Sequence, residues 1–347
     1  MDVQLPVEGS ATGSRTGLGN VFKLDYGLGR SLKDAGEIAA EAEQDCYSGV
    51  WSSESIHDPF LPLLLAAGAT SRVELGTSIA VALVRNPLVL ATTARDLQEY
   101  SQGRFILGLG TQTKAHITRR FGEEWSRPVA RMREFVSAMR AVWHCWDSGE
   151  RLNFEGDFYS HTLMTPAFNP GPSTFGPPKV FLAAVGERMT QAAGEVADGL
   201  LCHSFLTPAY FRDVLLPALH RGLESSGRSI DDFEVGIHPH IVTGSTEEEL
   251  AERIATVKYE IAFHASTPAY RAVLDHHGWG DLQPELNAMT KHGRWDELAG
   301  LIDDEVLRTF AVVARLHEVE AEVRRRYGDE VTRMSWRFAS DSTTTKR

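Results

Sequence analysis

The sequence has little of what marks secreted, membrane or nucleic-acid-binding proteins. Its 347 residues include only three cysteines, Cys46, Cys145 and Cys202, which are odd in number and far apart. That spacing favours reduced thiols over a disulfide framework. The sequence has no run of about eighteen apolar residues and no basic-then-apolar amino terminus. The net charge of -12 argues against nucleic acids and anionic membranes as partners. We therefore expect a cytoplasmic protein.

The residues that are present suit a soluble α/β domain. Hydrophobic residues make up 42% of the chain and charged residues 24%, which is ordinary for a globular protein. Strand and helix patterns alternate along the chain, which predicts a (β/α)8 barrel. We expect one domain over residues 1–338 and a disordered polar tail over 339–347. Residues 1–6 are expected to form the first strand, and the Gly-, Ser- and Thr-rich residues 8–20 a flexible loop after it.

Residues 73–112 carry the strongest pattern. Residues 73–84 are rich in β-branched side chains, as in a strand buried on both faces. Pro87 opens a helix, and a second apolar strand over 104–107 ends in Gly108-Leu109-Gly110-Thr111. Ligands of parallel α/β folds bind at the carboxyl ends of strands, so these small residues predict a binding site.

Further elements are expected on both sides of this unit. They are a strand at 50–51, helices at 31–44, 59–69 and 128–146, an insertion over about 150–178 with a hairpin at 153–159, and strands at 179–184, 199–203, 233–242 and 332–338.

Several spaced motifs resemble the bacterial luciferase-like monooxygenase superfamily. Within it they are most similar to the branch that uses coenzyme F420, an 8-hydroxy-5-deazaflavin. The motifs are Gly76-Thr77-Ser78-Ile79, Arg85-x-Pro87, Ser101-x-Gly103-Arg104-Phe105-x-Leu107-Gly108-x-Gly110, Gly49-Val50-Trp51-Ser52-Ser53-Glu54 and Phe181-Leu182-Ala183-Ala184-Val185-Gly186. The resemblance covers about residues 31–336. It implies a luciferase-like TIM barrel, with the insertion over the barrel mouth, that transfers a hydride between F420 and a small organic substrate.

The resemblance also implies where the cofactor binds. In this family the peptide that matches Ser78–Ile79 is cis and bulges against the deazaflavin ring. Independently, Val185-Gly186 precedes a helix whose first amides could bind an anion. The expected cofactor-binding residues are Ser78, Ile79, Gly110, Thr111, Gln112, Val185, Gly186 and Arg188.

Acid-base residues are expected after the second strand. Glu54, His57 and Asp58 cluster there, with His57 the first candidate and Glu54 the second, because imidazole exchanges protons near neutral pH. Asp58 could instead cap the following helix. Enzymes of the family that act on sugar phosphates carry Asp-His where Glu54-Ser55 stand here. A sugar phosphate is therefore not assigned as the substrate, nor Ser55 as the site of a base.

His116, His264 and Tyr270 are expected to line the substrate pocket. The alternative cofactor is FMN, which would make the protein a monooxygenase using reduced flavin and O2. A more distant alternative is a metal-dependent TIM-barrel hydrolase with His238 and His240 as ligands, although we expect no metal. A non-catalytic cofactor-storage protein is the remaining alternative.

A homodimer is expected, as the resemblance implies pairing through the second and third helices. Leucines there offer more apolar surface than one barrel needs. They are Leu61, Leu63, Leu64, Leu65, Leu88 and Leu90.

Overall fold

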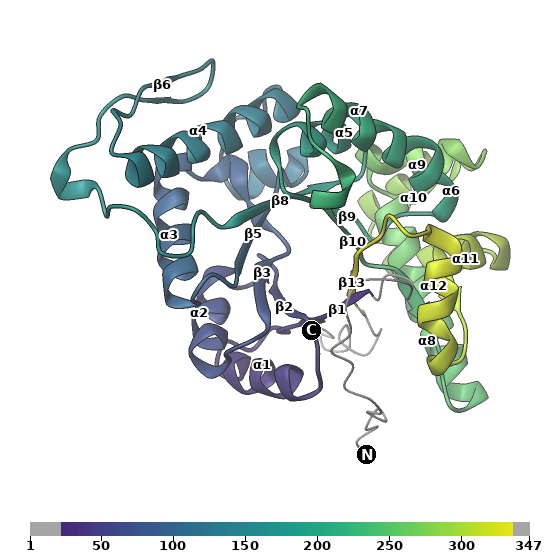
Figure 1. The fold of residues 1–347 in the computed structure, drawn as a ribbon. Helices are drawn as coiled ribbons and strands as arrows, with labels where there is room; N and C mark the ends of the chain where they lie inside the picture. The colour runs from purple at the N-terminus through teal and green to yellow at the C-terminus, as the bar shows by residue number, and fades with distance from the viewer. Residues whose placement is uncertain (1–21, 336–347) are drawn as a thin grey trace.

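Parallel strands alternate with helices and close into a barrel of eight strands in the computed structural model, which describes residues 22–335 (Figure 1). Each strand pairs in parallel with its two neighbours, and the pairing of β3 with β5 closes the ring. The barrel strands are β1 (Lys23–Gly27), β2 (Gly49–Ser52), β3 (Glu74–Thr77), β5 (Phe105–Gly110), β8 (Lys179–Ala184), β9 (Gly199–Cys202), β10 (Glu234–Ile237) and β13 (Arg333–Ser335). The predicted barrel is confirmed.

Helices surround these strands (Figure 1). The side chain of Asn86 accepts a hydrogen bond from the amide of Leu88 at 2.9 Å, so Asn86 caps α3 while Pro87 occupies its first turn. The helices that follow barrel strands are α1 (Ala35–Gln44), α2 (Phe60–Ala69), α3 (Pro87–Tyr100), α4 (Pro128–Ser148), α5 (Glu187–Val196), α7 (Leu216–Ser225, after the short α6, Pro208–Tyr210) and α8 (Glu247–Ala265). No helix within residues 22–335 is both long and apolar enough to span a bilayer.

The first barrel strand differs from the prediction. It is β1, which begins at Lys23, whereas we expected residues 1–6, which lie outside the described residues. The Gly- and Ser-rich residues 8–20 therefore precede the first barrel strand instead of following it. The sequence of β1 reads as polar because Lys23 and Asp25 point into the barrel, where they meet charged partners.

The strand predicted over residues 73–84 is interrupted. It comprises β3, a short β4 (Ala80–Val81) that pairs with β5, and a 3-10 turn (Ala82–Val84). The predicted strand at 233–242 likewise breaks at Pro239 into β10 and β11 (His240–Val242), because proline lacks the amide that a ladder requires.

The insertion over residues 150–178 contains the predicted hairpin, β6 (Phe154–Glu155) with β7 (Ser160–His161). Glu134 of α4 accepts hydrogen bonds from the amides of Phe158 and Tyr159, both at 2.7 Å, and Arg95 of α3 donates to the carbonyl of Gly171 at 2.9 Å. These contacts pack the insertion against α3 and α4 (Figure 1), and its hairpin lies beside the amino-terminal end of α4, where Arg127 pairs with Asp157 at 3.1 Å.

A second excursion, between β11 and β13, was not recognised as such from the sequence. Its strand β12 (Ala311–Val313) pairs in parallel with β11 outside the barrel. The excursion also contains α8, α9 (Arg271–His276), α10 (Leu282–Lys291), α11 (Asp304–Phe310) and α12 (Val319–Tyr327). Through α8 and the turn after it, this excursion brings His264 and Tyr270 beside the carboxyl end of β9.

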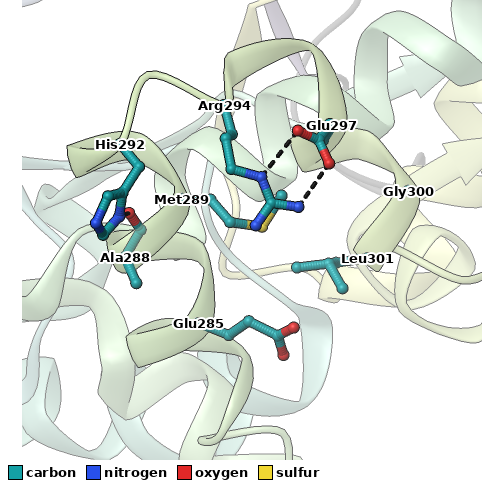
Figure 2. A pocket seen from close by; sticks show the side chains of 8 residues that line it. All are labelled: Glu285, Ala288, Met289, His292, Arg294, Glu297, Gly300 and Leu301. Carbon is teal, nitrogen blue, oxygen red and sulfur yellow. Dashed lines mark hydrogen bonds and ion pairs between the residues drawn. The ribbon is translucent and has the colours of Figure 1, made fainter.

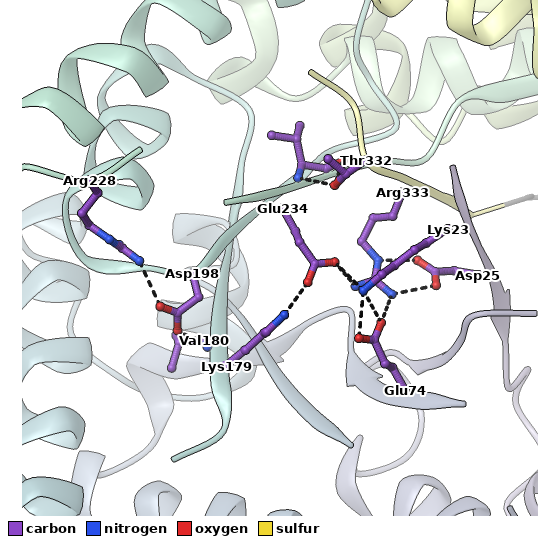
Figure 3. Close-up of polar contacts among 11 residues, drawn as sticks. Lys23, Asp25, Glu74, Lys179, Val180, Asp198, Arg228, Glu234, Thr332 and Arg333 are labelled. Atoms are coloured by element: carbon purple, nitrogen blue, oxygen red, sulfur yellow. Dashed lines mark hydrogen bonds and ion pairs between the residues drawn. The ribbon is translucent and has the colours of Figure 1, made fainter. Parts of the chain in front are cut away.

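Charged side chains fill the amino-terminal end of the barrel (Figure 3). Arg333, only 1% exposed, donates to Asp25, Glu74 and Glu234. Three cations face three carboxylates in this charged layer, which consists of Lys23, Lys179, Arg333, Asp25, Glu74 and Glu234. Five of the six begin a barrel strand, on the face where stability rather than catalysis is usually encoded.

Candidate active site

The floor of the barrel mouth is apolar. Trp51, Ile106, Phe181 and Leu201 form a buried cluster inside the barrel, and the partly buried Ile79 and Ala183 pack against it. Because side chains of a strand alternate between its faces, the residues two positions further along these strands point into the mouth. The mouth therefore has an apolar base at the carboxyl ends of the strands, where ligands of such barrels bind.

The Ser78–Ile79 peptide is cis, as predicted. Thr77 ties β3 to β5 just before it, because its hydroxyl donates to the carbonyl of Gly108 at 2.7 Å and accepts from the Gly108 amide at 2.9 Å. The Ser78 amide donates to the carbonyl of Ser52 at 2.7 Å. The segment is thus held by both neighbouring strands.

Gly108 and Gly110 of β5 allow the segment Thr77–Ile79 to approach this strand closely. A Cβ on Gly108 would lie 1.8 Å from the Thr77 carbonyl oxygen, and a Cβ on Gly110 would lie 2.8 Å from the Ile79 side chain. The sequence predicted that Gly110, with no side chain to occupy the room beside it, binds the cofactor. The structure fills that room with Ile79, so we assign Gly110 the role of accommodating Ile79.

Glu54 is engaged in a structural contact. Its carboxylate accepts from the Val81 amide at 2.7 Å and from the Arg85 guanidinium at 2.6 Å, and Arg85 also donates to the Val81 carbonyl at 2.8 Å. This arrangement anchors the residues after Ile79. It argues against the predicted acid-base role of Glu54, because the carboxylate is already engaged by two donors that anchor the chain.

Of the other two predicted acid-base residues, Asp58 lies 3.6 Å from the same Arg85 guanidinium. Asp58 accepts from the Phe60 amide at 2.9 Å, so it stabilises the start of α2, the alternative that the sequence left open. His57 is exposed in the loop between them. Of the three, His57 remains the candidate for proton exchange.

The loop after β5 lies beside the loop after β2. Arg120 donates to the carbonyl of Ser55 at 2.7 Å, which joins the two loops. Thr111 and Gln112 are half-buried at the strand end, whereas His116 is exposed. Gln112 has a φ of 60°, and its side chain accepts from the Thr113 amide at 2.9 Å. The predicted cofactor residues of this loop therefore lie at the mouth, with His116 further towards solvent.

The amino terminus of α5 is open. Gly186 occupies the N-cap position, and no side chain caps the helix. A Cβ on Gly186 would meet nothing within 4 Å. Val185 is half-buried and Arg188 exposed. Free amides and the positive end of the helix dipole make this a site suited to an anion such as phosphate.

Two histidines that sequence reasoning did not assign to the active site stand on the opposite side of the mouth. His238, at the end of β10, contacts the Ser335 hydroxyl and lies 3.5 Å from the Ser78 hydroxyl. His203, just after β9, lies 3.4 Å from the hydroxyl of Tyr270. Tyr270 and His264 pack against His203, so the structure brings these two predicted pocket residues together there. An alternation count along β9 could have found His203.

The two histidines considered as metal ligands have separate partners. His240 pairs with Glu260 at 3.2 Å, while His238 contacts the two serines. Within residues 22–335, no group of three or more His, Cys, Asp or Glu side chains is arranged to hold a metal ion.

A separate shallow pocket of about 400 Å³ lies on the surface of α10 and the following 3-10 turn (Figure 2). Arg294 donates to Glu297 across it. Its lining residues are Glu285, Ala288, Met289, His292, Arg294, Glu297, Gly300 and Leu301. None of them belongs to the barrel mouth.

Comparison with known proteins agrees with this geometry. The model of the luciferase-like monooxygenase family matches residues 9–333. An uncharacterized protein of Mycobacterium tuberculosis is 50% identical over 313 residues, which cover 90% of this chain and 92% of that protein. An F420-dependent glucose-6-phosphate dehydrogenase of Kineococcus radiotolerans is 30% identical over 296 residues, covering 80% and 84% of the two chains.

Solved structures share the fold. A coenzyme F420 dependent tetrahydromethanopterin reductase from Methanopyrus kandleri aligns with a TM-score of 0.74 and 21% identity, covering 92% of this chain and 93% of that one. An F420-dependent secondary alcohol dehydrogenase aligns with a TM-score of 0.67 and 17% identity, covering 91% and 92%. The chain belongs to the luciferase-like monooxygenase family, in the branch that contains the F420-dependent oxidoreductases.

Proposed function

We propose that this protein transfers a hydride between F420 and a small organic substrate bound at the barrel mouth. One observation carries the proposal. The apolar floor at Ile79 and the open amino terminus of α5 lie at the same end of the barrel, so a planar ring and its phosphate could be held together. The deazaflavin would supply the hydride chemistry, while the protein supplies binding, orientation and proton exchange.

The residues at the mouth fit this cofactor. Space is open in front of Gly186, and no side chain occupies the cap position of α5, as a phosphate site requires. Ser78, Ile79, Thr111 and Gln112 would contact the ring side. Val185, Gly186 and Arg188 would contact the phosphate side.

His57 is our proposed acid-base residue. It lies in the loop after β2, at the reactive end of the barrel, and its imidazole can take or give a proton near neutral pH. The paired state of Glu54 and the turn contact of Asp58 leave His57 as the titratable side chain of this loop without such a structural contact. His116 is the alternative from the neighbouring loop.

We further propose a homodimer formed through α2 and α3. Leu61, Leu64 and Leu65 of α2 are 45–51% exposed, and Val89 of α3 is 62% exposed. Leu63 and Leu90 are buried in the chain's own core, so they do not contribute the surface that we expected of them. Exposed leucines gathered on one helix are typical of an interface.

A single-turnover experiment tests the proposed activity. The full-length protein, mixed anaerobically with reduced F420 and a panel of small carbonyl compounds, is expected to convert the cofactor to its oxidised, strongly absorbing form. Reduced FMN at the same concentration, in place of F420, is expected to give no turnover. Consumption of O2 with reduced FMN would instead support a flavin monooxygenase.

A further inference from the structure

Tyr270 is held rigidly at the β9 side of the mouth. Its ring stacks on Phe205 with a centroid distance of 6.0 Å and an interplanar angle of 25°. The His203 ring lies 4.8 Å away, and the His264 ring 6.4 Å away. Tyr270 ends the 3-10 turn Pro268–Tyr270 that follows α8, so the second excursion delivers it to the barrel.

His203 points into the mouth. Gly199 and Leu201 of the same strand face the barrel interior, because a Cβ on Gly199 would lie 2.6 Å from the Phe181 ring and Leu201 packs in the interior cluster. His203 stands two residues beyond Leu201 and therefore faces the same way. The hydroxyl of Tyr270 lies 3.4 Å from its Nε2 atom.

The hydrogen bonds of His203 fix the direction of this contact. The amide of Phe205 donates to His203 Nδ1 at 2.9 Å, so Nδ1 carries a lone pair and the proton of the neutral ring is on Nε2. Nε2–H can then donate to the Tyr270 oxygen but cannot accept a hydrogen bond from its hydroxyl. The tyrosine hydroxyl consequently directs its own proton away from His203, towards another acceptor. Burial raises the pKa of Tyr270, which keeps that proton in place.

We propose that Tyr270 donates a hydrogen bond to an oxygen of the substrate and that His203 is the positioning residue that orients it. This inference rests on the proposed function. It narrows the substrate to compounds with a carbonyl or hydroxyl oxygen on the carbon that exchanges the hydride. Phe205 and the neutral His203 beside the hydroxyl carry no positive charge. An uncharged ketone or alcohol therefore suits this side of the mouth better than a phosphate ester.

The orientation can be measured without cofactor or substrate. In the full-length protein labelled with ¹⁵N-histidine, with His203 assigned from the His203→Gln variant, long-range ¹H–¹⁵N correlation spectra report the tautomer of each ring. We expect His203 to be the Nε2–H tautomer at neutral pH. An Nδ1–H tautomer, or an imidazolium at neutral pH, would overturn the proposal.

Kinetics then test the role in turnover. With F420 and either cyclohexanol or cyclohexanone, Tyr270→Phe is expected to lower kcat/KM about 10²-fold while leaving F420 affinity unchanged. His203→Ala should have a similar effect, and the double variant no further loss. His203→Gln should retain more activity than His203→Ala, because its amide can both accept and donate. Tyr259→Phe, on the solvent side of α8, is the matched control.

The experiments distinguish a failure of this inference from a failure of the proposed function. Failure of the wild-type protein to bind F420 would contradict the proposed function, while the spectra would still decide the orientation of His203. Binding of F420 with turnover of glucose 6-phosphate but of neither cyclohexanol nor cyclohexanone would overturn only the preference for an uncharged substrate. Additive losses in the double variant, or full activity of Tyr270→Phe, would overturn the roles of both residues.

Discussion

Arg333 and Asp25 join the last and first strands of the barrel through a buried bidentate ion pair. Nε and Nη2 of Arg333 donate to the two carboxylate oxygens of Asp25 at 2.8 and 2.9 Å, and the residues are 308 positions apart. The guanidinium carbon also lies 4.7 Å from the ring centroid of Trp51. Burial raises the pKa of Asp25 in spite of the Arg333 charge beside it, so the carboxylate depends on this partner.

Arg333→Ala is expected to destabilise the fold by about 3–5 kcal/mol, because it leaves buried carboxylates without their partner. Arg333→Lys should recover little of the lost stability, because an ammonium group cannot reproduce the planar array of donors of a guanidinium. Urea denaturation followed by circular dichroism measures both. Arg294→Ala is the control, because it breaks an exposed pair with Glu297 and should leave stability unchanged. Equal stability of the Arg333 and Arg294 variants would contradict the structural role of the charged layer.

Glu234 should make stability dependent on acid. Burial alone would raise its pKa, but the charges of Arg333, Lys179 and Lys23 lower it to about 2. A depressed carboxyl pKa contributes stability above its unfolded value of about 4.3, and that contribution is lost as the pH falls towards the folded value. Glu234→Gln should be less stable than the wild type at neutral pH, with the difference shrinking between about pH 4.5 and pH 2. A difference in the free energy of unfolding between the wild type and Glu234→Gln that stays constant across this pH range would contradict the prediction.

Some of the fold was readable from the sequence because it depends on local patterns. The start of α3 could be predicted because Asn86 caps the helix and Pro87 fits its first turn. The cis peptide Ser78–Ile79 could be predicted because the surrounding residues match a family motif. The first barrel strand was missed because Lys23 and Asp25 face inwards, and their burial depends on Arg333 at the far end of the chain. A pattern of apolar residues cannot reveal a strand whose interior face is charged.

The candidate site shows the same division. The loops that carry Glu54 and His57 were located correctly at the strand ends, yet the pairing of Glu54 with Arg85 arises only when the chain turns back after Ile79. His238 attracted attention as a metal ligand because Pro239 and His240 follow it. Its contact with Ser78 joins residues 160 positions apart, which no local spacing encodes.

The loop after β2 offers a direct comparison of two candidate residues. His57→Ala should lower turnover by roughly 10²–10⁴-fold with cofactor affinity nearly unchanged. Glu54→Gln should instead lower thermal stability, because it weakens the contacts to Val81 and Arg85. Pre-steady-state kinetics and thermal melts on the same preparations separate the two effects. Full turnover in His57→Ala would move the acid-base role to His116 or to the Tyr270 side of the mouth.

The phosphate side of the proposed cofactor site can be tested at Gly186. Its φ of -112° suits any residue, and a Cβ there meets nothing within 4 Å, so Gly186→Val should fold normally. The added side chain would fill the space in front of α5, and we expect the dissociation constant for F420 to rise about tenfold or more. Fluorescence titration measures this. Unchanged affinity in a well-folded variant would place the phosphate elsewhere.

The proposed dimer depends on exposed leucines of α2. Replacing Leu61, Leu64 and Leu65 with glutamate should convert a dimer into a folded monomer, because burial of three charges at an interface without partners is unfavourable. Light scattering at micromolar concentration gives the mass, and Leu163→Glu, at a 76% exposed position in the insertion, is the control. A wild-type monomer at that concentration would count against the interface.

The choice of cofactor is the centre of this account, and an equilibrium titration of the full-length protein decides it. Oxidised F420 and FMN are added separately to equal protein samples, and bound cofactor is measured by fluorescence and by dialysis. The account predicts saturable binding of F420 at one site per chain, no comparable binding of FMN, and weaker F420 binding in Gly186→Val. Tight binding of FMN with none of F420 would contradict it.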